Sequence, residues 1–314
     1  MVTDNKEKNF ISAVVYVHNA ENNIADFLSM LIRVLESNFE NSEIICVNDC
    51  SDDNSVGEIK RVCMDADTAA VTVINLSYFH GLELAMGAGM DLSIGDFVFE
   101  FDKNIVDYDE ELIMAVYRRA LEGYDIVSVS PDKKERFASR IFYRIFQHYS
   151  GNHYKMTSES FRILSRRLIN RINSMNRTVP YRKAIYADSG LRSDNLRYEV
   201  KAGVDTAADR REQNYRWDLA VDSLILFTEM GYRFSMTMTG VMMAIAVFML
   251  LYSVITYLLI HPVAGWTTTI LFLSVAFLGL FGILTIIIKY LQIILNMLFR
   301  RKRYNFESIE KLTK

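Results

Sequence analysis

The stretch that decides the fold is Ala70–Phe101, AVTVINLSYFHGLELAMGAGMDLSIGDFVFEF. It begins with the apolar, β-branched run Ala70–Leu76, continues through a helical segment at Leu82–Ser93, and ends with a second apolar run at Asp96–Phe101. Both runs have the length and composition of buried strands. A strand, a helix and a further strand in this order predict two parallel strands joined by a crossover helix.

The same alternation extends to both sides of this stretch. Further strands are predicted at Phe10–Val17, Glu43–Val47 and Asp125–Val129, and further helices at Asn22–Leu35, Ser55–Met64 and Glu110–Glu122. The sequence therefore predicts an α/β domain with a mainly parallel central sheet. No G-x-G-x-x-G follows the first strand and no G-x-x-x-x-G-K-[ST] occurs, so neither a dinucleotide-binding Rossmann domain nor a P-loop is supported.

Ligands of such sheets bind beyond the carboxyl ends of the strands, so the loops that follow the strands are the candidate site. These loops are His18–Asn23, Asn48–Ser55, Ser77–Gly81 and Asp102–Asp107, and three of them are rich in carboxylates and amides. The cysteines, Cys46, Cys50 and Cys63, fit no metal-binding spacing and are interpreted as small packing residues.

The mean hydropathy of +0.09 is the average of two different compositions. Thr239–Ile260 and Thr267–Ile288 contain no charged residue, and at about 1.5 Å per residue each can cross a hydrocarbon core of about 30 Å. We therefore expect a soluble domain at 1–235, a transmembrane hairpin at 239–299 and a basic tail at 300–314. Within the tail, Tyr304–Lys314 is predicted to form a short exposed helix.

The flanks of the two spans predict their orientation. The sequence RRKR at Arg300–Arg303 follows the second span, whereas the connection His261–Trp266 has no Lys or Arg. The positive-inside bias then predicts a two-span protein of the cell membrane with its catalytic domain and both termini in the cytoplasm. The N-terminus has no apolar stretch of the kind that signal peptides contain.

Charge is divided unevenly along the chain, whose net charge is −3. Residues 1–130 hold 8 Lys and Arg against 24 Asp and Glu, whereas residues 131–238 hold 20 against 12. The basic portion adjoins the first span, and its amphipathic segments near 139–148 and 216–235 are expected to lie on the membrane surface; packing against the sheet is the alternative for 139–148. No basic-aromatic pattern typical of nucleic-acid binding stands out.

Four pieces in chain order carry a family resemblance. They are SAVVYVHNAENNI (Ser12–Ile24), IICVNDCSDDNS (Ile44–Ser55), the stretch Leu76–Asn104, and SESFRILSRR (Ser158–Arg167). Together they resemble the family-two inverting glycosyltransferases, which have a GT-A nucleotide-sugar domain, and the two C-terminal spans resemble those of the polyprenyl-phosphate sugar transferase branch. The resemblance implies that Tyr16, His18, Asn19, Glu21, Asp49, His80 and Gly81 bind the nucleotide-sugar.

The metal motif of the family, Asp-x-Asp, falls on Asp102-Lys103-Asn104. The resemblance implies that Asp102 is catalytic and that Asp102 and Asn104 hold Mg²⁺ or Mn²⁺, which prefer oxygen ligands and can neutralise a diphosphate leaving group. Asn104 replaces the second carboxylate and Lys103 lies between the two. These departures leave open whether the chain binds the metal and whether it is fully active.

The segment Ser158–Arg167 is compatible with two kinds of acceptor, a sugar hydroxyl or a lipid phosphate. A sugar hydroxyl must lose a proton, and Glu159 is the one carboxylate near Phe161-Arg162 that could act as the catalytic base. A lipid phosphate is already ionised and needs cations, which Arg162, Ser165 and Arg166 could supply as donors. The absence of the Asp that the family often has before its Phe-Arg favours the phosphate.

The expected function is therefore transfer of a sugar, with inversion, from a UDP-sugar to a polyprenyl phosphate or lipid-linked glycan in cell-envelope polysaccharide synthesis. A membrane-anchored nucleotide-sugar-binding subunit with impaired catalysis and a transferase that uses Glu159 on a sugar hydroxyl are the alternatives. Membrane lipids are expected partners, nucleic acids are not, and a homo-oligomer stays open.

Overall fold

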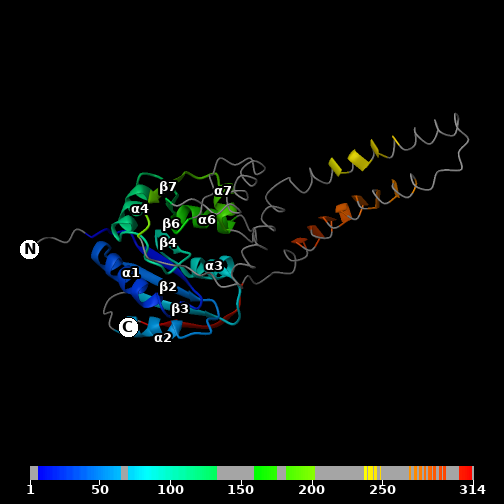
Figure 1. The fold of residues 1–314 in the computed structure, drawn as a ribbon. Helices are drawn as coiled ribbons and strands as arrows, with labels where there is room; N and C mark the ends of the chain where they lie inside the picture. The colour runs from blue at the N-terminus through cyan, green and yellow to red at the C-terminus, as the bar shows by residue number, and fades with distance from the viewer. Residues whose placement is uncertain are drawn as a thin grey trace, which may run out of the picture. The chain divides into compact units, whose positions relative to one another are not determined.

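The computed structural model describes residues 6–64, 70–132, 159–174, 182–201 and 304–312, together with isolated helical positions between 237 and 294 (Figure 1). The chain divides into two compact units. One unit combines Met1–Ala220 with Lys302–Lys314, and the other is Val221–Arg301.

The first unit is built on an eight-stranded sheet with the order β7-β5-β6-β4-β1-β2-β3-β8. Its strands are β1 (Ile11–Val17), β2 (Ser42–Asn48), β3 (Ala70–Leu76), β4 (Phe97–Phe101), β5 (Ile126–Pro131), β6 (Phe161–Ser165), β7 (Ser193–Tyr198) and β8 (Phe306–Lys311). Its helices are α1 (Ile24–Asn38), α2 (Ser55–Met64), α3 (Leu82–Leu92), α4 (Glu111–Leu121), α6 (Arg166–Ser174) and α7 (Arg182–Asp188). The five strands and four helices predicted between Phe10 and Val129 are confirmed to within a few residues.

Helices cover both faces of the sheet, which is why β1 is buried along its whole length. On one face the core contains Phe27 of α1, Ile59 of α2 and Tyr117 of α4. On the other face it contains Met86 of α3 and Tyr186 of α7. Continuous apolar strands are the pattern that two covered faces require.

The central strands β3, β2, β1 and β4 are parallel, as predicted. The whole sheet is mixed, however, because β6 runs antiparallel to both β4 and β5, and β8 runs antiparallel to β3. The antiparallel β6 brings Arg162 directly opposite Glu100 of β4. This register places two opposite charges side by side on the face that α3 and α7 cover.

The tail differs from the prediction of a short exposed helix. Phe306–Lys311 forms the edge strand β8, and the backbone N–H of Ser77 and of Leu312 bond the carbonyls of Asn305 and Val71 at its two ends. A six-residue segment has little intrinsic tendency to be helical, and the open edge of β3 supplies backbone hydrogen bonds that a solvated helix of this length would lack.

The predicted membrane segments fall largely outside the described residues. The segments near 139–148 and 216–235 and the connection His261–Trp266 are not described, and the spans Thr239–Ile260 and Thr267–Ile288 are described only at isolated helical positions. In the part of the chain that is described, no helix has both the length and the apolar character needed to cross a membrane. The hairpin stays a prediction.

Candidate functional site

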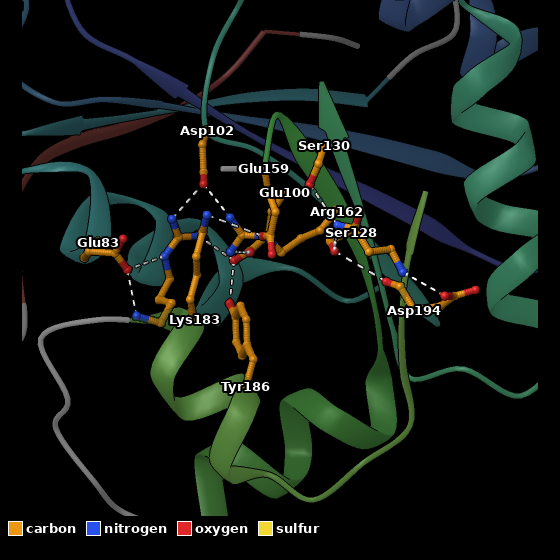
Figure 2. Close-up of polar contacts among 12 residues, drawn as sticks. Glu83, Glu100, Asp102, Ser128, Ser130, Glu159, Arg162, Lys183, Tyr186 and Asp194 are labelled. Atoms are coloured by element: carbon orange, nitrogen blue, oxygen red, sulfur yellow. Dashed lines mark hydrogen bonds and ion pairs between the residues drawn. The ribbon is translucent and has the colours of Figure 1, made fainter. Parts of the chain in front are cut away.

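A buried cluster of charged side chains lies at the carboxyl end of β4 (Figure 2). We call it the arginine cluster; its members are Glu83, Glu100, Asp102, Glu159, Arg162, Arg182, Lys183 and Tyr186. Strand β4 supplies Glu100 and is followed directly by Asp102, while β6 supplies Arg162 and α7 supplies the residues from Arg182 to Tyr186. The cluster thus joins segments that are far apart in the sequence.

Arg162 is fully buried and reaches both acidic residues at the end of β4. Its Nη1 donates to Glu100 Oε2 at 3.0 Å and its Nη2 donates to Asp102 Oδ2 at 2.5 Å. Its Nε lies 3.0 Å from Glu159 Oε2, and Lys183 Nζ lies 3.6 Å from the same oxygen. A buried guanidinium requires such compensation, because an unpaired charge in the interior is costly.

Arg182 approaches the same carboxylates from α7. Its Nε donates to Glu83 Oε2 at 2.9 Å, its Nη1 to Glu100 Oε1 at 2.6 Å, and its Nη2 to Asp102 Oδ1 at 2.8 Å. The hydroxyl of Tyr186 donates to Glu100 Oε1 at 2.8 Å. Each carboxylate oxygen of Asp102 therefore accepts a hydrogen bond from a different arginine.

The charges of the cluster hold Asp102 in its ionised form. Burial by itself would raise the pKa of this carboxyl, but Arg162 and Arg182 outweigh burial and place the pKa well below its usual range. The neighbouring Tyr186 shows the opposite effect, since burial and the adjacent Glu100 raise the pKa of its hydroxyl. Asp102 is therefore ionised at neutral pH and is paired with two buried arginines.

This arrangement is a poor fit to the metal site that the resemblance implies. Asp102 already accepts hydrogen bonds from two guanidinium groups, and Asn104 has a neutral amide in place of a carboxylate. Lys103, which is exposed, places a positive charge between these two residues in the sequence. Among the described residues there is no group of three or more His, Cys, Asp or Glu side chains that could hold a metal ion. A divalent cation on Asp102 would be repelled by Arg162, Arg182 and Lys183, the cations that act on this carboxylate.

A second buried carboxylate, Asp49, organises the loops expected to hold the nucleotide. Its Oδ1 accepts the backbone N–H of His80 at 2.7 Å, and its Oδ2 accepts the N–H of Gly81 at 2.8 Å and the hydroxyl of Tyr16 at 3.1 Å. His18 Nδ1 lies 2.8 Å from the Asp49 carbonyl oxygen. Tyr16, His80 and Gly81, all predicted to bind the donor, therefore meet at the carboxylate of Asp49, and His18 meets its backbone carbonyl.

Two conformations in these loops depend on residue type. Gly81 has a φ of 85°, and Asn19 has a φ of 47°, a left-handed conformation that Asn tolerates better than most residues. The Oδ1 of Asn19 accepts the N–H of Asp52 at 2.9 Å, and Glu21 Oε2 accepts the N–H of Asn54 at 3.1 Å. Asn19 and Glu21, both predicted to bind the donor, thus hold the loop after β1 against the loop after β2.

The predicted acceptor residues do not gather at one place. Arg162 belongs to the arginine cluster, but Ser165 pairs in register with Phe97, at the opposite end of β4. The two positions are three residues apart along the strand, which is about 10 Å. Ser165 Oγ donates to Asp125 at 2.7 Å and Arg166 Nε donates to the Gly95 carbonyl at 2.8 Å. The structure therefore does not bring Ser165 and Arg166 to the donor end of the sheet.

Five members of the arginine cluster were not predicted from the sequence: Glu83, Glu100, Arg182, Lys183 and Tyr186. Glu100 had a visible signal, because it is a charged residue inside the apolar strand DFVFEF. Arg182 had none, since its partner Asp102 lies 80 positions earlier in the chain.

Comparisons with known proteins agree with this fold. The family described as Glycosyl transferase family 2 matches residues 12–175, just over half of the chain. An uncharacterized glycosyltransferase, sll0501 of Synechocystis sp., is 26% identical over 69% of this chain and 69% of its own length. The undecaprenyl-phosphate 4-deoxy-4-formamido-L-arabinose transferase of Edwardsiella ictaluri is 29% identical over 48% of this chain, and the match spans 47% of that relative.

A solved structure has the same fold across most of the chain. The mannosyltransferase PcManGT from Pyrobaculum calidifontis, in complex with GDP-Man and Mn²⁺, superimposes with a TM-score of 0.51 at 13% identity and covers 88% of each chain. At this identity the likeness supports a GT-A type α/β domain.

Proposed function

Because the chain belongs to glycosyl transferase family 2, we propose that it is a membrane-bound inverting transferase that moves a sugar from a UDP-sugar to a polyprenyl phosphate. Glycosyltransferase activity follows from the family and from the glycosyltransferase relatives. The UDP donor, the lipid acceptor, the membrane location and a role in cell-envelope polysaccharide synthesis are the proposed parts. A lipid-linked glycan is the alternative acceptor.

Several relatives support a lipid acceptor, since each is named an undecaprenyl-phosphate 4-deoxy-4-formamido-L-arabinose transferase. Each of them shares less than half of its length with this chain. The lipid acceptor of these relatives is therefore proposed, by analogy, for this protein.

Exposed apolar side chains support the membrane location. At described helical positions of the second unit, large apolar side chains recur every three or four residues and are about half exposed: Leu273, Phe277, Leu280, Leu284, Ile287, Leu291 and Ile294. A stripe of this kind is unfavourable in water and favourable in lipid. It overlaps the predicted span Thr267–Ile288 and extends beyond it.

The return of the chain to its first domain supports a hairpin. Residues Met1–Ala220 and Lys302–Lys314 form one compact unit, and β8 pairs with β3 inside it. Both ends of the intervening segment Val221–Arg301 therefore start from the same folded domain. A segment with both ends on one side of a membrane can cross it only an even number of times.

One observation carries the choice of a phosphate acceptor over a sugar hydroxyl. The side chain of Glu159, the one predicted base, is completely buried and lies 3.0 Å from Arg162 Nε and 3.6 Å from Lys183 Nζ. A buried carboxylate already paired with two cations is poorly placed to take a proton from an acceptor hydroxyl. An ionised phosphate oxygen needs no base, because it can attack the anomeric carbon directly.

In the proposed reaction, an acceptor phosphate oxygen forms a bond to the anomeric carbon from the face opposite the leaving group. The bond between that carbon and the nucleoside diphosphate breaks, and its electron pair leaves on the diphosphate. The loops around Asp49 are assigned to the nucleotide, and the buried positive charges of Arg162, Arg182 and Lys183 are assigned to stabilising the phosphate groups electrostatically. Attack from the opposite face accounts for inversion.

The test uses the full-length protein in detergent with a panel of UDP-sugars. We expect labelled sugar to be transferred to undecaprenyl phosphate and not to undecaprenol, which lacks the phosphate.

Glu159→Gln should retain most of the turnover per folded molecule, because Glu159 takes no proton. Loss of turnover in folded Glu159→Gln would favour the hydroxyl acceptor. UDP-sugar binding without transfer or hydrolysis would favour the impaired binding subunit, an alternative suggested by the Asp102-Lys103-Asn104 motif.

A further inference from the structure

The metal motif of the family and the geometry of Asp102 disagree in this chain. We propose that Asp102 is a positioning residue that holds Arg162 and Arg182 at the donor end of β4, and that these guanidinium groups, rather than a divalent cation on Asp102, supply the positive charge beside the diphosphate. This inference rests on the proposed function for the identity of the diphosphate. Its consequence is a transferase that does not need Mg²⁺ or Mn²⁺.

The first argument is the crowding of positive charge around Asp102. Its Oδ1 accepts from Arg182 Nη2 at 2.8 Å and its Oδ2 accepts from Arg162 Nη2 at 2.5 Å. A divalent ion bonded to either oxygen at about 2.1 Å would lie within about 5 Å of a guanidinium nitrogen. Like charges at that distance in a site with little water repel strongly.

The second argument is that neither arginine can leave easily. Arg182 also bonds Glu83 at 2.9 Å and Glu100 at 2.6 Å, and Arg162 also bonds Glu100 at 3.0 Å. The side chain of Glu100 is completely buried, so moving either arginine away would strip a buried carboxylate of a partner. Removing one partner from a buried pair is strongly destabilising. The cations are therefore fixed parts of the site.

The third argument is the hydrogen-bonding capacity of a guanidinium. Each arginine has five N–H donors in a planar fork, and the described side-chain hydrogen bonds of Arg182 use three of them. The geometry of the fork matches phosphate oxygens. The replacement of the second motif carboxylate by Asn104 removes a negative charge that a metal would use and that a diphosphate would repel.

The metal part is tested with full-length protein in detergent, stripped with EDTA. Titration with Mn²⁺, followed by the electron paramagnetic resonance signal of the free ion, should reveal no stoichiometric site that Asp102→Asn abolishes. Calorimetry should give a Kd for UDP that changes by less than about threefold between EDTA and Mn²⁺ buffers. A stoichiometric Mn²⁺ site lost in Asp102→Asn, or UDP binding at least tenfold tighter with Mn²⁺, would overturn the proposal. The Mn²⁺ titration needs no donor, so its outcome is separate from that of the proposed function.

The cationic part is tested with Arg182→Lys, which keeps the charge but removes the fork. We expect UDP to bind this variant at least tenfold more weakly in EDTA. Arg192→Lys is the matched control, because its guanidinium lies 4.8 Å from the Tyr124 ring and outside the arginine cluster; it should bind UDP as the unmodified protein does. Equal UDP affinity in folded Arg182→Lys would overturn the role of the guanidinium. Absence of UDP binding by the unmodified protein in both buffers would contradict the proposed function and this inference together.

Discussion

At the scale of single residues, the environment of a carboxylate decides what it can do. Asp49 and Asp102 both end central parallel strands and both lie where the family resemblance predicts ligand contacts. The structure surrounds Asp49 with backbone N–H groups and a tyrosine hydroxyl, and Asp102 with two guanidinium groups. Each carboxylate is therefore a structural anchor for its neighbours, whatever it contacts in a complex.

The lowered pKa of Asp102 predicts how stability depends on acid. Its pKa is below its usual range in the folded protein because Arg162 and Arg182 outweigh burial, whereas in the unfolded chain it is about 3.9. The resulting stabilisation is complete above the unfolded pKa and is lost as the pH falls through about 4 toward the folded pKa. Acid should therefore weaken the arginine cluster.

We expect Asp102→Asn to lower the free energy of unfolding by about 3–5 kcal/mol at pH 7, because it removes one partner from a buried ion cluster. Between pH 5 and pH 3 the variant should lose less stability than the unmodified protein. The measurement is the thermal midpoint from circular dichroism in detergent at a series of pH values. Asp109→Asn, in an exposed pair with Lys201 at 2.8 Å, is the control and should cost at most about 1 kcal/mol. Parallel pH curves for Asp102→Asn and the unmodified protein would contradict the prediction.

At the scale of elements, β8 connects the end of the chain to a candidate donor loop. The backbone N–H of Asn305 donates to His80 Nε2 at 3.2 Å, and Asn75 Nδ2 donates to Ser308 Oγ at 2.9 Å. His80 in turn donates its own N–H to Asp49. The last strand of the sheet therefore supports the loop Ser77–Gly81 from the side opposite to β2.

Proline substitutions should reveal this support. The N–H of Leu312 bonds the Val71 carbonyl, so by antiparallel alternation the N–H of Glu310 faces β3 and that of Ile309 faces away. Glu310→Pro should remove a ladder bond and speed hydrogen exchange in β3, whereas Ile309→Pro should have a much smaller effect. Glu310→Ala separates the loss of the ion pair with Lys60 from the loss of the backbone bond. Equal exchange in the two proline variants would show that β8 does not hold the edge of the sheet in solution.

At the scale of the whole molecule, the division of the chain restricts its proposed membrane topology. The segment Val221–Arg301 leaves and re-enters one folded unit, so its two ends share a compartment. In the proposed topology, the acidic first part of the chain would face the nucleotide-sugar, and the basic portions next to the predicted spans would face the lipid headgroups.

Cysteine labelling in intact bacterial cells tests this topology. We expect Gly265→Cys, in the predicted external connection, to react with a membrane-impermeant maleimide, and Glu307→Cys, at an exposed position of β8, to react only after permeabilisation. The native thiols are internal controls, because Cys46 and Cys63 are buried and Cys50 lies in the same domain as β8. Labelling of Glu307→Cys in intact cells would contradict a cytoplasmic catalytic domain.

Much of the fold could be predicted because its signals are local. The apolar runs that became β1 to β5 and the helical spacing of Ile24, Phe27, Leu31 and Leu35 are visible within a few residues of sequence, and two covered faces leave little freedom for such runs. The candidate site could be located for the same reason: in a parallel sheet, all strand-following loops gather at one edge.

The alternating α/β domain, the edge that carries the loops, the family resemblance and the two uncharged segments can all be recognised in the amino-acid sequence. The pairing of Asp102 with two arginines, the position of Ser165 and Arg166 at the other end of β4, and the strand in the tail become visible only in the folded domain. These contacts join residues that are far apart along the chain. Asp102 and Arg182 are 80 positions apart and Asn75 and Glu310 are 235 apart, and no local propensity encodes a partner that only folding brings near.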